Sequence, residues 1–484
     1  MWIFAAILLL GALYLWHVNR VMKRVPDEAT KLSPHRWTVE EIKAAYKKSL
    51  ESPIDVSKSL PPKQNRRYVI VGGTGLVGTW IINHLLTRGE DPKAIRILDL
   101  ASPDEILKQG VGWIKTNITD KLAVTTAFEE PWPTHVSKLP LTVYHTAALI
   151  RPQDRLRCFL PLSSKVNIDG TRIVLEAAKT AGASVFIWTS SGSTRLRSPT
   201  FWVPPWIRYP KHAVQVISDR TTAPQAHSDF FGNYAISKHQ AEQIVRAADD
   251  PASGFRTGCI RPTNGVYGTG GVSKTAVTEI YLYNGGAPTW AAPVIQSFVH
   301  AENVSLAHLL YEQRLIQQSE PGCTLPNTGG QSFIVSDPNP AIAFGDLYKV
   351  LMTLSTTPVE FPELQPAPFL LLSYFVEVYA ILRFNFGILP RLPPDLEQLQ
   401  PALFGILNVH IFADDSRAKL APEKGGLGYN PPLTTLEGLC RRLVDWNTKA
   451  QTEGVHVKGK KIVLGPVKVS EDGVGVDIVT PVKL

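Results

Sequence analysis

The sequence contains little of what metal or disulfide chemistry requires. Four of its 484 residues are cysteines, without a Cys-x-x-Cys pair or a histidine at metal-ligand spacing: Cys158, Cys259, Cys323 and Cys440. We therefore expect no bound metal and no disulfide framework, but reduced and mostly buried thiols. Charged residues make up only 19%, and the net charge of +8 comes without a dense Lys/Arg block. Nucleic-acid binding has little support, and the positive charge fits an anionic membrane surface better.

An uninterrupted apolar run with tryptophans at its ends occupies residues 2–16. It reaches about 22 Å as a helix, short of a hydrocarbon core of about 30 Å unless Val18 and Val21 extend it. No positive charge precedes the run and no small residues follow it, so an uncleaved anchor is favoured over a signal peptide. The basic residues after it predict a cytosolic body: Arg20, Lys23 and Arg24. We predict a membrane anchor over 1–24, in the endoplasmic reticulum, and a proline-containing linker with one small helix over 25–66.

Residues 67–78 carry the strongest local pattern in the chain. A β-branched and aromatic strand over 67–71 is followed by Gly72, Gly75 and Gly78, and a helix-like run begins at Leu76. One glycine would make the tight turn, one would let the main chain approach a pyrophosphate, and one would pack helix on strand. The pattern predicts a dinucleotide site, although a purely structural turn is the alternative when such a loop stands alone.

The next elements repeat the alternation of strand and helix. A second strand over 94–98 ends in Asp99, which would accept hydrogen bonds from ribose hydroxyls and repel a 2′-phosphate, so NAD is favoured over NADP. A solvated strand-end aspartate is the alternative, because Asp99 lies 27 residues after Gly72 instead of the usual twenty or so. Further strands are expected near 113–116, over 141–146 and over 184–189. Ala147 leaves room for a cofactor, and hydroxyl side chains at 189–193 would face the ligand crevice.

Tyr234 and Lys238 lie one turn apart on a helix predicted from 233 to about 248. A tyrosine of pKa about 10 is a poor base near neutrality, but a nearby ammonium and a positively charged nicotinamide both favour the phenolate. The Tyr-x-x-x-Lys pattern occurs by chance in many helices. Its weight here comes from its position after the glycine turn, the acidic strand end and the hydroxyl-bearing strand end.

The chain resembles the extended short-chain dehydrogenase/reductases over residues 68–439, and within them the 3β-hydroxysteroid dehydrogenase and sterol 4α-carboxylate 3-dehydrogenase family. The general phrases are Gly72 to Gly78, Val143-Tyr144-His145-Thr146-Ala147-Ala148, Asn167 to Thr171, Tyr234 to Lys238, Ile260-Arg261-Pro262 and Tyr267-Gly268. More specific to the steroid branch are Phe298 to Val304 with Ala307-His308, Gln331 to Asp337, and Leu427-Gly428-Tyr429-Asn430-Pro431.

The resemblance implies a role for each matched residue. It places the general base on Tyr234, the ribose-binding lysine on Lys238 and the hydroxyl-orienting residue on Ser191, with Ser190 as the fallback. The cofactor set implied by pattern and resemblance together is Gly72, Gly75, Leu76, Gly78, Asp99, Asn117, Ala147, Tyr234, Lys238 and Pro262, with no metal. Two positions depart from the family: Asn117 replaces a frequent aspartate near the adenine, and Glu302 replaces the usual aspartate before Asn303.

The expected fold is α/β, a Rossmann-type doubly wound parallel sheet over 67–265 with a smaller substrate region over 266–450, partly interleaved with the sheet, and a tail over 451–484. The apolar stretch 369–386 contains Glu377 and Arg383, which argue against a second membrane span. It is predicted either to lie on the membrane or roof an apolar pocket, or to be a buried core helix. The tail is expected to form short valine-rich strands without chemistry.

The predicted function is NAD-dependent oxidation of the 3β-hydroxyl of a sterol or triterpenoid to a ketone, with or without loss of a C4 carboxylate. The alternatives are another extended short-chain reductase or epimerase, and a non-catalytic cofactor-sensing protein. The expected partners are an apolar substrate and a membrane, not nucleic acid, and a homodimer is left open. Because the body is expected in the cytosol, neither glycosylation acceptor pattern, Asn117-Ile118-Thr119 or Asn303-Val304-Ser305, should carry glycan.

Overall fold

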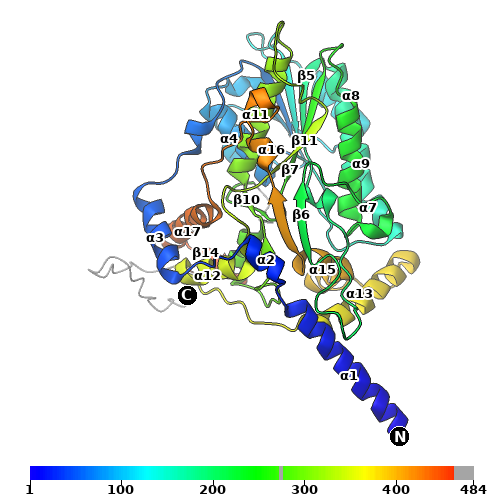
Figure 1. Cartoon of the computed structure of the whole chain (residues 1–484). Helices are drawn as coiled ribbons and strands as arrows, with labels where there is room; N and C mark the ends of the chain where they lie inside the picture. The colour runs from blue at the N-terminus through cyan, green and yellow to red at the C-terminus, as the bar shows by residue number, and fades with distance from the viewer. Residues whose placement is uncertain (272–275, 463–484) are drawn as a thin grey trace.

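A seven-stranded parallel sheet forms the centre of the molecule, seen in a computed structural model that describes residues 1–271 and 276–462 (Figure 1). Its strands lie in the order β11-β7-β5-β4-β1-β2-β3, and each neighbouring pair is parallel. In chain order the strands are β1 (Arg67–Val71), β2 (Ile95–Asp99), β3 (Gly112–Lys115), β4 (Leu141–His145), β5 (Ala183–Thr189), β7 (Arg256–Pro262) and β11 (Gln331–Val335). The predicted Rossmann-type sheet is confirmed.

Helices cover both faces of this sheet because its strands are apolar on both sides. Tyr68 and Ile70 of β1 belong to the core under one face, and Val69 and Val71 belong to the core under the other. The first face carries α4 (Leu76–Thr87) and α11 (Ala301–Gln318). The second carries α6 (Lys121–Glu129), α8 (Thr171–Thr180) and α9 (Asn233–Ala247). A π-helical turn over Lys165–Gly170 leads into α8.

The C-terminal region and the sheet exchange elements in both directions. A second sheet has the order β12-β9-β13-β6, with strands β6 (Val214–Ser218), β9 (Ile295–Gln296), β12 (Ile342–Ala343) and β13 (His410–Asp414). Strand β6 comes from within the predicted Rossmann segment, whereas β11 crosses from the C-terminal region into the main sheet. A boundary near residue 265 therefore separates the chain in sequence but not in space.

A buried carboxylate, that of Asp337, joins two of the three phrases of the steroid branch, and Tyr267 and Thr435 are its other partners. Its Oδ1 accepts from the backbone N–H of His300 at 2.8 Å and from Asn303 Nδ2 at 2.7 Å. Its Oδ2 accepts from the Tyr267 hydroxyl at 2.8 Å and the Thr435 hydroxyl at 2.9 Å. Burial raises the pKa of Asp337 to about 6 although these donors act the other way. The phrases that marked the family thus hold the C-terminal region onto the sheet.

The segment 25–66 carries more than one short helix and packs on the C-terminal region. It contains α2 (Asp27–Leu32), α3 (Val39–Glu51) and a 3₁₀ turn over Val56–Ser59. Helix α3 begins with a capping box between Thr38 and Glu41, and its Ile42 is fully buried. Its neighbours are α12 (Phe344–Leu354) and α17 (Thr435–Thr452). These contacts fix the predicted linker to the body.

The remaining described elements are short and connect these layers. The helices are α5 (Asp104–Leu107), α7 (Leu160–Ser164), α10 (Val277–Asn284), α14 (Pro394–Gln398), α15 (Pro401–Leu407) and α16 (Ser416–Lys419). Strands β8 (Val266–Tyr267) and β10 (Val299–His300) pair in parallel, and β14 (Val455–Val457) and β15 (Lys460–Ile462) form an antiparallel hairpin. This hairpin lies within the first part of the predicted tail over 451–484, and residues 463–484 lie outside the described residues.

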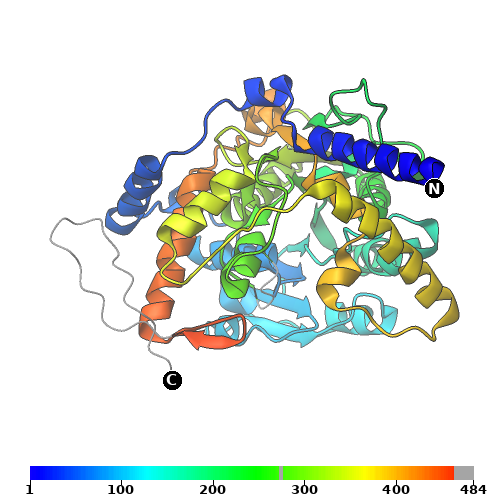
Figure 2. The same cartoon turned by 90° about the horizontal axis from the view of Figure 1, so that it is seen from below.

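Two long apolar helices lie together at one end of the molecule, α1 (Trp2–Lys23) and α13 (Pro366–Phe386) (Figures 1 and 2). Both segments, Trp2–Leu32 and Pro366–Phe386, are long and apolar enough to cross a membrane by length and composition. Only 28% of the apolar window of α13 is buried. Helix α13 is therefore not a core helix.

Candidate active site

The glycine turn between β1 and α4 has the geometry that close approach of a ligand requires. Gly72 has a φ of +82°, and a methyl group on it would lie 2.4 Å from the backbone nitrogen of Ala147. A methyl on Gly78 would lie 2.4 Å from the carbonyl oxygen of Gly72. Gly75 is the N-cap of α4, without a side-chain cap and without an acidic residue in the first turn. The N–H groups of the first turn, from Leu76 onward, therefore have no side chain competing for them, which fits a pyrophosphate.

Asp99 lies at the carboxyl end of β2, next to this turn. Its Oδ2 accepts a hydrogen bond from the backbone N–H of Thr74 at 3.0 Å, and its Oδ1 accepts from Leu100 N–H at 2.7 Å. Asn117 follows the adjacent strand β3, is exposed, and accepts from the N–H and hydroxyl of Thr119 at 3.1 and 3.0 Å. The structure thus brings Asp99 to the glycine turn, whereas the Asn117 amide is engaged in its own local turn.

A loop after β8 that sequence reasoning did not single out packs on the same turn. Trp80 Nε1 of α4 donates to the carbonyl oxygen of Thr269 at 2.5 Å. A methyl on Gly271, whose φ is +78°, would lie 3.0 Å from main-chain atoms of Gly75 and Leu76. The glycines at 268, 270 and 271 could have predicted this contact, because several glycines close together allow one main-chain segment to approach another.

Tyr234 and Ser191 meet where β5 ends and α9 begins. The Ser191 hydroxyl lies near the Tyr234 phenol, and Ser191 Oγ lies 2.8 Å from Ser193 Oγ. Burial raises the pKa of Tyr234 to about 12, and the nearby Ser191 hydroxyl opposes that rise. Ser190, the fallback, instead donates to Glu242 at 2.6 Å. The geometry therefore pairs Ser191, and not Ser190, with the tyrosine.

Lys238 lies one helical turn beyond Tyr234 and is only 2% exposed. Its Nζ donates to the carbonyl oxygen of Thr189 at 2.7 Å and lies 3.8 Å from the centroid of the Trp188 ring. Burial lowers the pKa of Lys238 to about 7, against weaker opposing effects of Cys259 and Glu242. The Thr189 hydroxyl is hydrogen-bonded to His308 Nε2 at 2.8 Å, so the family phrase that contains His308 contacts the carboxyl end of β5.

A buried charge network behind the tyrosine and lysine was not found from the sequence. Glu242, one turn after Lys238 on α9, accepts from Arg261 Nε at 2.8 Å and lies 3.1 Å from Arg195 Nη2. Burial opposes its ionisation, but Arg261 and Arg195 hold the pKa of Glu242 at about 2. Pro262 follows Arg261 at the end of β7, and its carbonyl oxygen would lie 3.2 Å from a methyl on Gly192. The network thus joins α9, the Ser190 turn and the end of β7.

The four cysteines are unpaired in the structure, and they are not mostly buried as predicted. Cys259 and Cys440 are buried, whereas Cys158 and Cys323 are exposed. None of the four lies within the predicted set of catalytic residues. Among the described residues no group of three or more His, Cys, Asp or Glu side chains could hold a metal ion.

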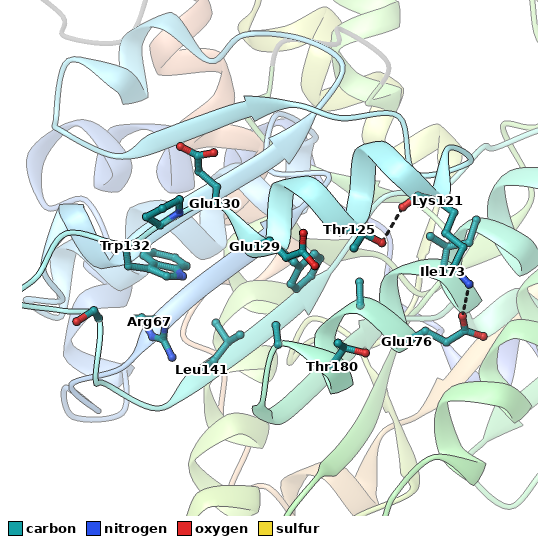
Figure 3. Close-up of a pocket in the computed structure, with 15 residues that line it drawn as sticks. Arg67, Lys121, Thr125, Glu129, Glu130, Trp132, Leu141, Ile173, Glu176 and Thr180 are labelled. Carbon is teal, nitrogen blue, oxygen red and sulfur yellow. Dashed lines mark hydrogen bonds and ion pairs between the residues drawn. The ribbon is translucent and has the colours of Figure 1, made fainter.

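A groove of about 570 Å³ lies between α6 and α8 (Figure 3). Its lining includes Arg67 and Leu141, which begin β1 and β4, so it opens at the amino ends of the strands. Lys121 and Glu176 bridge its rim at 3.7 Å. Ligands of parallel sheets bind at the carboxyl ends, so we assign this groove no part in catalysis.

Comparison with known proteins gives one matching family model, described as the 3-beta hydroxysteroid dehydrogenase/isomerase family, over residues 69–357. The 3beta-hydroxysteroid-dehydrogenase/decarboxylase isoform 2 of Arabidopsis thaliana is 24% identical over 399 residues, 78% of this chain and 61% of that protein. The decarboxylating sterol-4-alpha-carboxylate 3-dehydrogenase of Homo sapiens is 24% identical over 383 residues, 79% of this chain and 88% of that protein. The chain thus spans less than two thirds of the Arabidopsis relative.

Solved structures with the same architecture are more distant in sequence. UDP-glucose 4-epimerase of Thermotoga maritima, with UDP-glucose, has a TM-score of 0.52 and 17% identity, over 79% of this chain and 99% of the other. MoeE5 in complex with UDP-glucuronic acid and NAD has a TM-score of 0.52 and 16% identity, with the same coverage of 79% and 99%. At these identities the likeness shows a shared fold.

Proposed function

The chain belongs to the 3-beta hydroxysteroid dehydrogenase/isomerase family, and we propose that it oxidises the 3β-hydroxyl of a sterol or triterpenoid to a ketone with NAD. The observation that carries this proposal is the meeting of Tyr234, Lys238 and Ser191 at the carboxyl ends of the parallel sheet. A glycine turn of the required shape lies at the end of β1 in the same sheet. The relatives named as dehydrogenases support the same reaction class.

The residues at the carboxyl ends of β1 and β2 fit a dinucleotide. Gly72, Gly75 and Gly78 leave main-chain room beside the uncapped start of α4, and Ala147 adds only a methyl group opposite Gly72. Asp99 presents a carboxylate at the neighbouring strand end, where it would accept from ribose hydroxyls and repel a 2′-phosphate. We therefore propose NAD instead of NADP. Asn117 would line the adenine side, and Pro262 the nicotinamide side.

Each catalytic side chain has a task that its surroundings support. Tyr234 would take the proton of the substrate hydroxyl, and Ser191, which lies near Tyr234, would hold the same oxygen. A pKa of about 12 leaves little phenolate at neutral pH, so positive charge beside the ring has to lower it. Protonated Lys238 would supply one such charge and bind the ribose. Bound NAD would accept the hydride and contribute a second positive charge through its oxidised ring.

The side chains against which Tyr234 packs are apolar. The tyrosine packs against a buried cluster that includes Ile236, Phe231, Val409 and Ile411. A sterol or triterpenoid skeleton suits such surroundings, whereas a nucleotide sugar calls for polar and cationic side chains. Where the substrate carries a carboxylate at C4, oxidation at C3 makes it a β-keto acid, which loses carbon dioxide as the C–C bonding electrons pass into an enolate.

We further propose that α1 anchors the enzyme in a membrane, in the endoplasmic reticulum, with the body in the cytosol. Helix α1 has 22 residues and so continues through Val18 and Val21, beyond the apolar run over 2–16. Arg20 and Lys23 lie in its last turn. Val18 and Val21 themselves are buried against the body, so the exposed part of the helix lies N-terminal to them.

The deciding experiment is product analysis with the full chain in membranes, NAD, and 3β-hydroxysterols with and without a 4-carboxylate. We expect a 3-ketone, and carbon dioxide from the carboxylated substrate only. Tyr234→Phe should lower turnover by about 100-fold or more while NAD affinity changes little, because the ring stays in place. A Tyr234→Phe enzyme that keeps a tenth or more of the activity would show that another base operates. The alternative of a cofactor-binding protein without turnover would be supported if NAD binds and no sterol is oxidised.

A further inference from the structure

The end of β5 makes two contacts in the active site, with one serine between them. Lys238 Nζ donates to the carbonyl oxygen of Thr189 at 2.7 Å, and the Ser191 hydroxyl lies near the catalytic tyrosine. Ser190 stands between these two residues and is 4% exposed. Its hydroxyl points to neither contact, because Ser190 Oγ donates to Glu242 Oε2 at 2.6 Å. A shift of Ser190 would therefore displace both neighbours.

Glu242 ties this strand end to the helix that carries the catalytic tyrosine and lysine. It is fully buried on α9, one turn after the lysine. Besides Ser190, its carboxylate accepts from Arg261 Nε at 2.8 Å, from Arg261 Nη2 at 2.5 Å and from Arg195 Nη2 at 3.1 Å. Arg195 ends the 3₁₀ turn that follows β5. The carboxylate thus holds the chain on both sides of Ser191 to α9.

The hydrogen bonds of this network are incomplete. Arg195 Nε and Arg261 Nη1 are buried and have no hydrogen-bond partner among the described residues. Arg261 Nη1 lies 3.6 Å from Asp219 Oδ1, which is too far for a good hydrogen bond. Buried charges with unpaired donors cost free energy, and apolar side chains of similar volume would fill the same space without that cost. Stability therefore does not explain the network, whereas the placement of Ser190 does.

We propose that Glu242 is a positioning residue that acts on the active site through Ser190. Its hydrogen bond holds the end of β5 where the Thr189 carbonyl meets Lys238. The same bond fixes the backbone from which Ser191 reaches the substrate oxygen. A hydroxyl that donates to a carboxylate forms a bond roughly twice as strong as a neutral one, and a displacement of about 1 Å in an active site can lower a rate by about 100-fold. The inference rests on the proposed function.

Ser190→Ala removes the hydrogen bond, and Ser336→Ala is the matched control. Ser336 also directly follows a strand of the main sheet, β11, and donates to a buried carboxylate, Asp415 Oδ2, at 2.8 Å. With sterol and NAD, Ser190→Ala should lower kcat by about tenfold and change both KM values by less than about twofold, because the groups that bind cofactor and substrate remain present. The control should keep its kcat.

Three results of this comparison would overturn the proposal. They are an unchanged kcat in Ser190→Ala, a higher KM in place of the lower kcat, and an equal loss of kcat in Ser336→Ala. The last result would mean that the loss of any such bond near the sheet slows turnover.

Glu242→Asp tests whether the two residues act as one unit. The shorter side chain keeps the charge that the two arginines require, and it withdraws the carboxylate from Ser190 by one methylene. Because each substitution breaks the same hydrogen bond, Glu242→Asp, Ser190→Ala and the double variant should all lose about tenfold in kcat. A loss of about 100-fold in the double variant would mean independent effects and would contradict the proposal. If Glu242→Asp does not fold, the comparison of the two serine variants decides.

Hydrogen exchange separates this inference from the proposed function. If the unmutated chain oxidises no sterol, the proposed function fails, and the order of the strand end is measured on the backbone amides of residues 190–195. The Ser190 N–H donates to the carbonyl oxygen of Ile260 at 2.7 Å. These amides should exchange about tenfold faster in Ser190→Ala than in the control variant. Equal exchange in both variants would show that the bond to Glu242 does not hold the strand end.

Discussion

Lys238 is a buried cation that the fold accommodates at a cost, and Lys238→Met measures that cost. Its ammonium has one hydrogen-bond acceptor, the carbonyl oxygen of Thr189, and the face of Trp188. Methionine keeps a flexible stem of similar length and removes the charge. We expect the variant to be inactive and yet more stable than the unmutated protein near pH 6.

The magnitude follows from the pKa. Burial lowers the pKa of Lys238 from 10.5 to about 7, and each unit is worth about 1.36 kcal/mol, so the charge costs on the order of 5 kcal/mol at low pH. Contact with the Trp188 ring offsets about 2 kcal/mol of this, and an unpartnered Thr189 carbonyl in the variant costs about 1 kcal/mol. The net gain for Lys238→Met is therefore about 2 kcal/mol at pH 6.

The gain should depend on pH in a defined direction. Between about pH 7 and 10.5 the unfolded chain holds a proton on Lys238 that the folded chain has lost. The free energy of unfolding of the unmutated protein therefore rises with pH across this window. Below the window, the full cost of the buried Lys238 charge remains. Because Lys238→Met has no such group, its advantage of about 2 kcal/mol should shrink by about 1.36 kcal/mol per pH unit above pH 7, disappear near about pH 8.5 and be reversed at about pH 10.

Urea unfolding in detergent, followed by tryptophan fluorescence at pH 6, 8 and 10, measures these differences. The matched control is Lys179→Met, because Lys179 is exposed and its Nζ lies 5.5 Å from the centroid of the Phe255 ring. It should change the free energy of unfolding by less than about 0.5 kcal/mol, equally at each pH. A Lys238→Met protein that is less stable at pH 6, or whose difference does not vary with pH, would refute the reasoning.

Three other predictions follow from the described contacts. Asp99→Ala should narrow the preference for NAD over NADP in the ratio of kcat/KM values, since the carboxylate that would repel a 2′-phosphate is gone; equal efficiency with both cofactors before mutation would contradict this. Glu242→Gln should lower the free energy of unfolding by about 3 kcal/mol, because Arg261 and Arg195 would lose their buried counter-charge; a change below about 0.5 kcal/mol would show that the network is relaxed. In a eukaryotic host Asn117, which is exposed, should carry no glycan if the body is cytosolic. A glycosidase-sensitive mass shift would contradict a cytosolic body. Asn303 is fully buried and cannot serve as a second reporter.

Local pattern was sufficient for the elements around the glycine turn. The strand predicted over 67–71 is β1, the helix predicted from Leu76 is α4, and the strand predicted to end at Asp99 is β2. Each of these carries its own signal, because a buried parallel strand is apolar throughout and a turn with positive φ needs glycine. The placement of Tyr234 beside Ser191 required one more assumption, that parallel strands bring their carboxyl ends together.

Contacts between distant segments could not be predicted in this way. Glu242 reads as one polar residue on an amphipathic helix, and only the fold brings Arg195 and Arg261 to it. Asp337 likewise is one aspartate after a strand until His300, Asn303 and Thr435 meet it. Burial of charge depends on partners far along the chain, so a linear pattern shows the charge but not its neutralisation.

The same limit explains why α13 was hard to interpret. In the sequence, Glu377 interrupts an apolar stretch and counts against a second membrane span. Its partner Arg155 lies 222 residues away, and their two hydrogen bonds turn the carboxylate toward the body. An apolar stretch with one acidic residue therefore has two physical interpretations, a helix unsuited to lipid and a helix whose only acidic group is held beneath it. The position of the ion pair favours the second, because Phe375 and Val378 next to Glu377 are exposed while Glu377 is not.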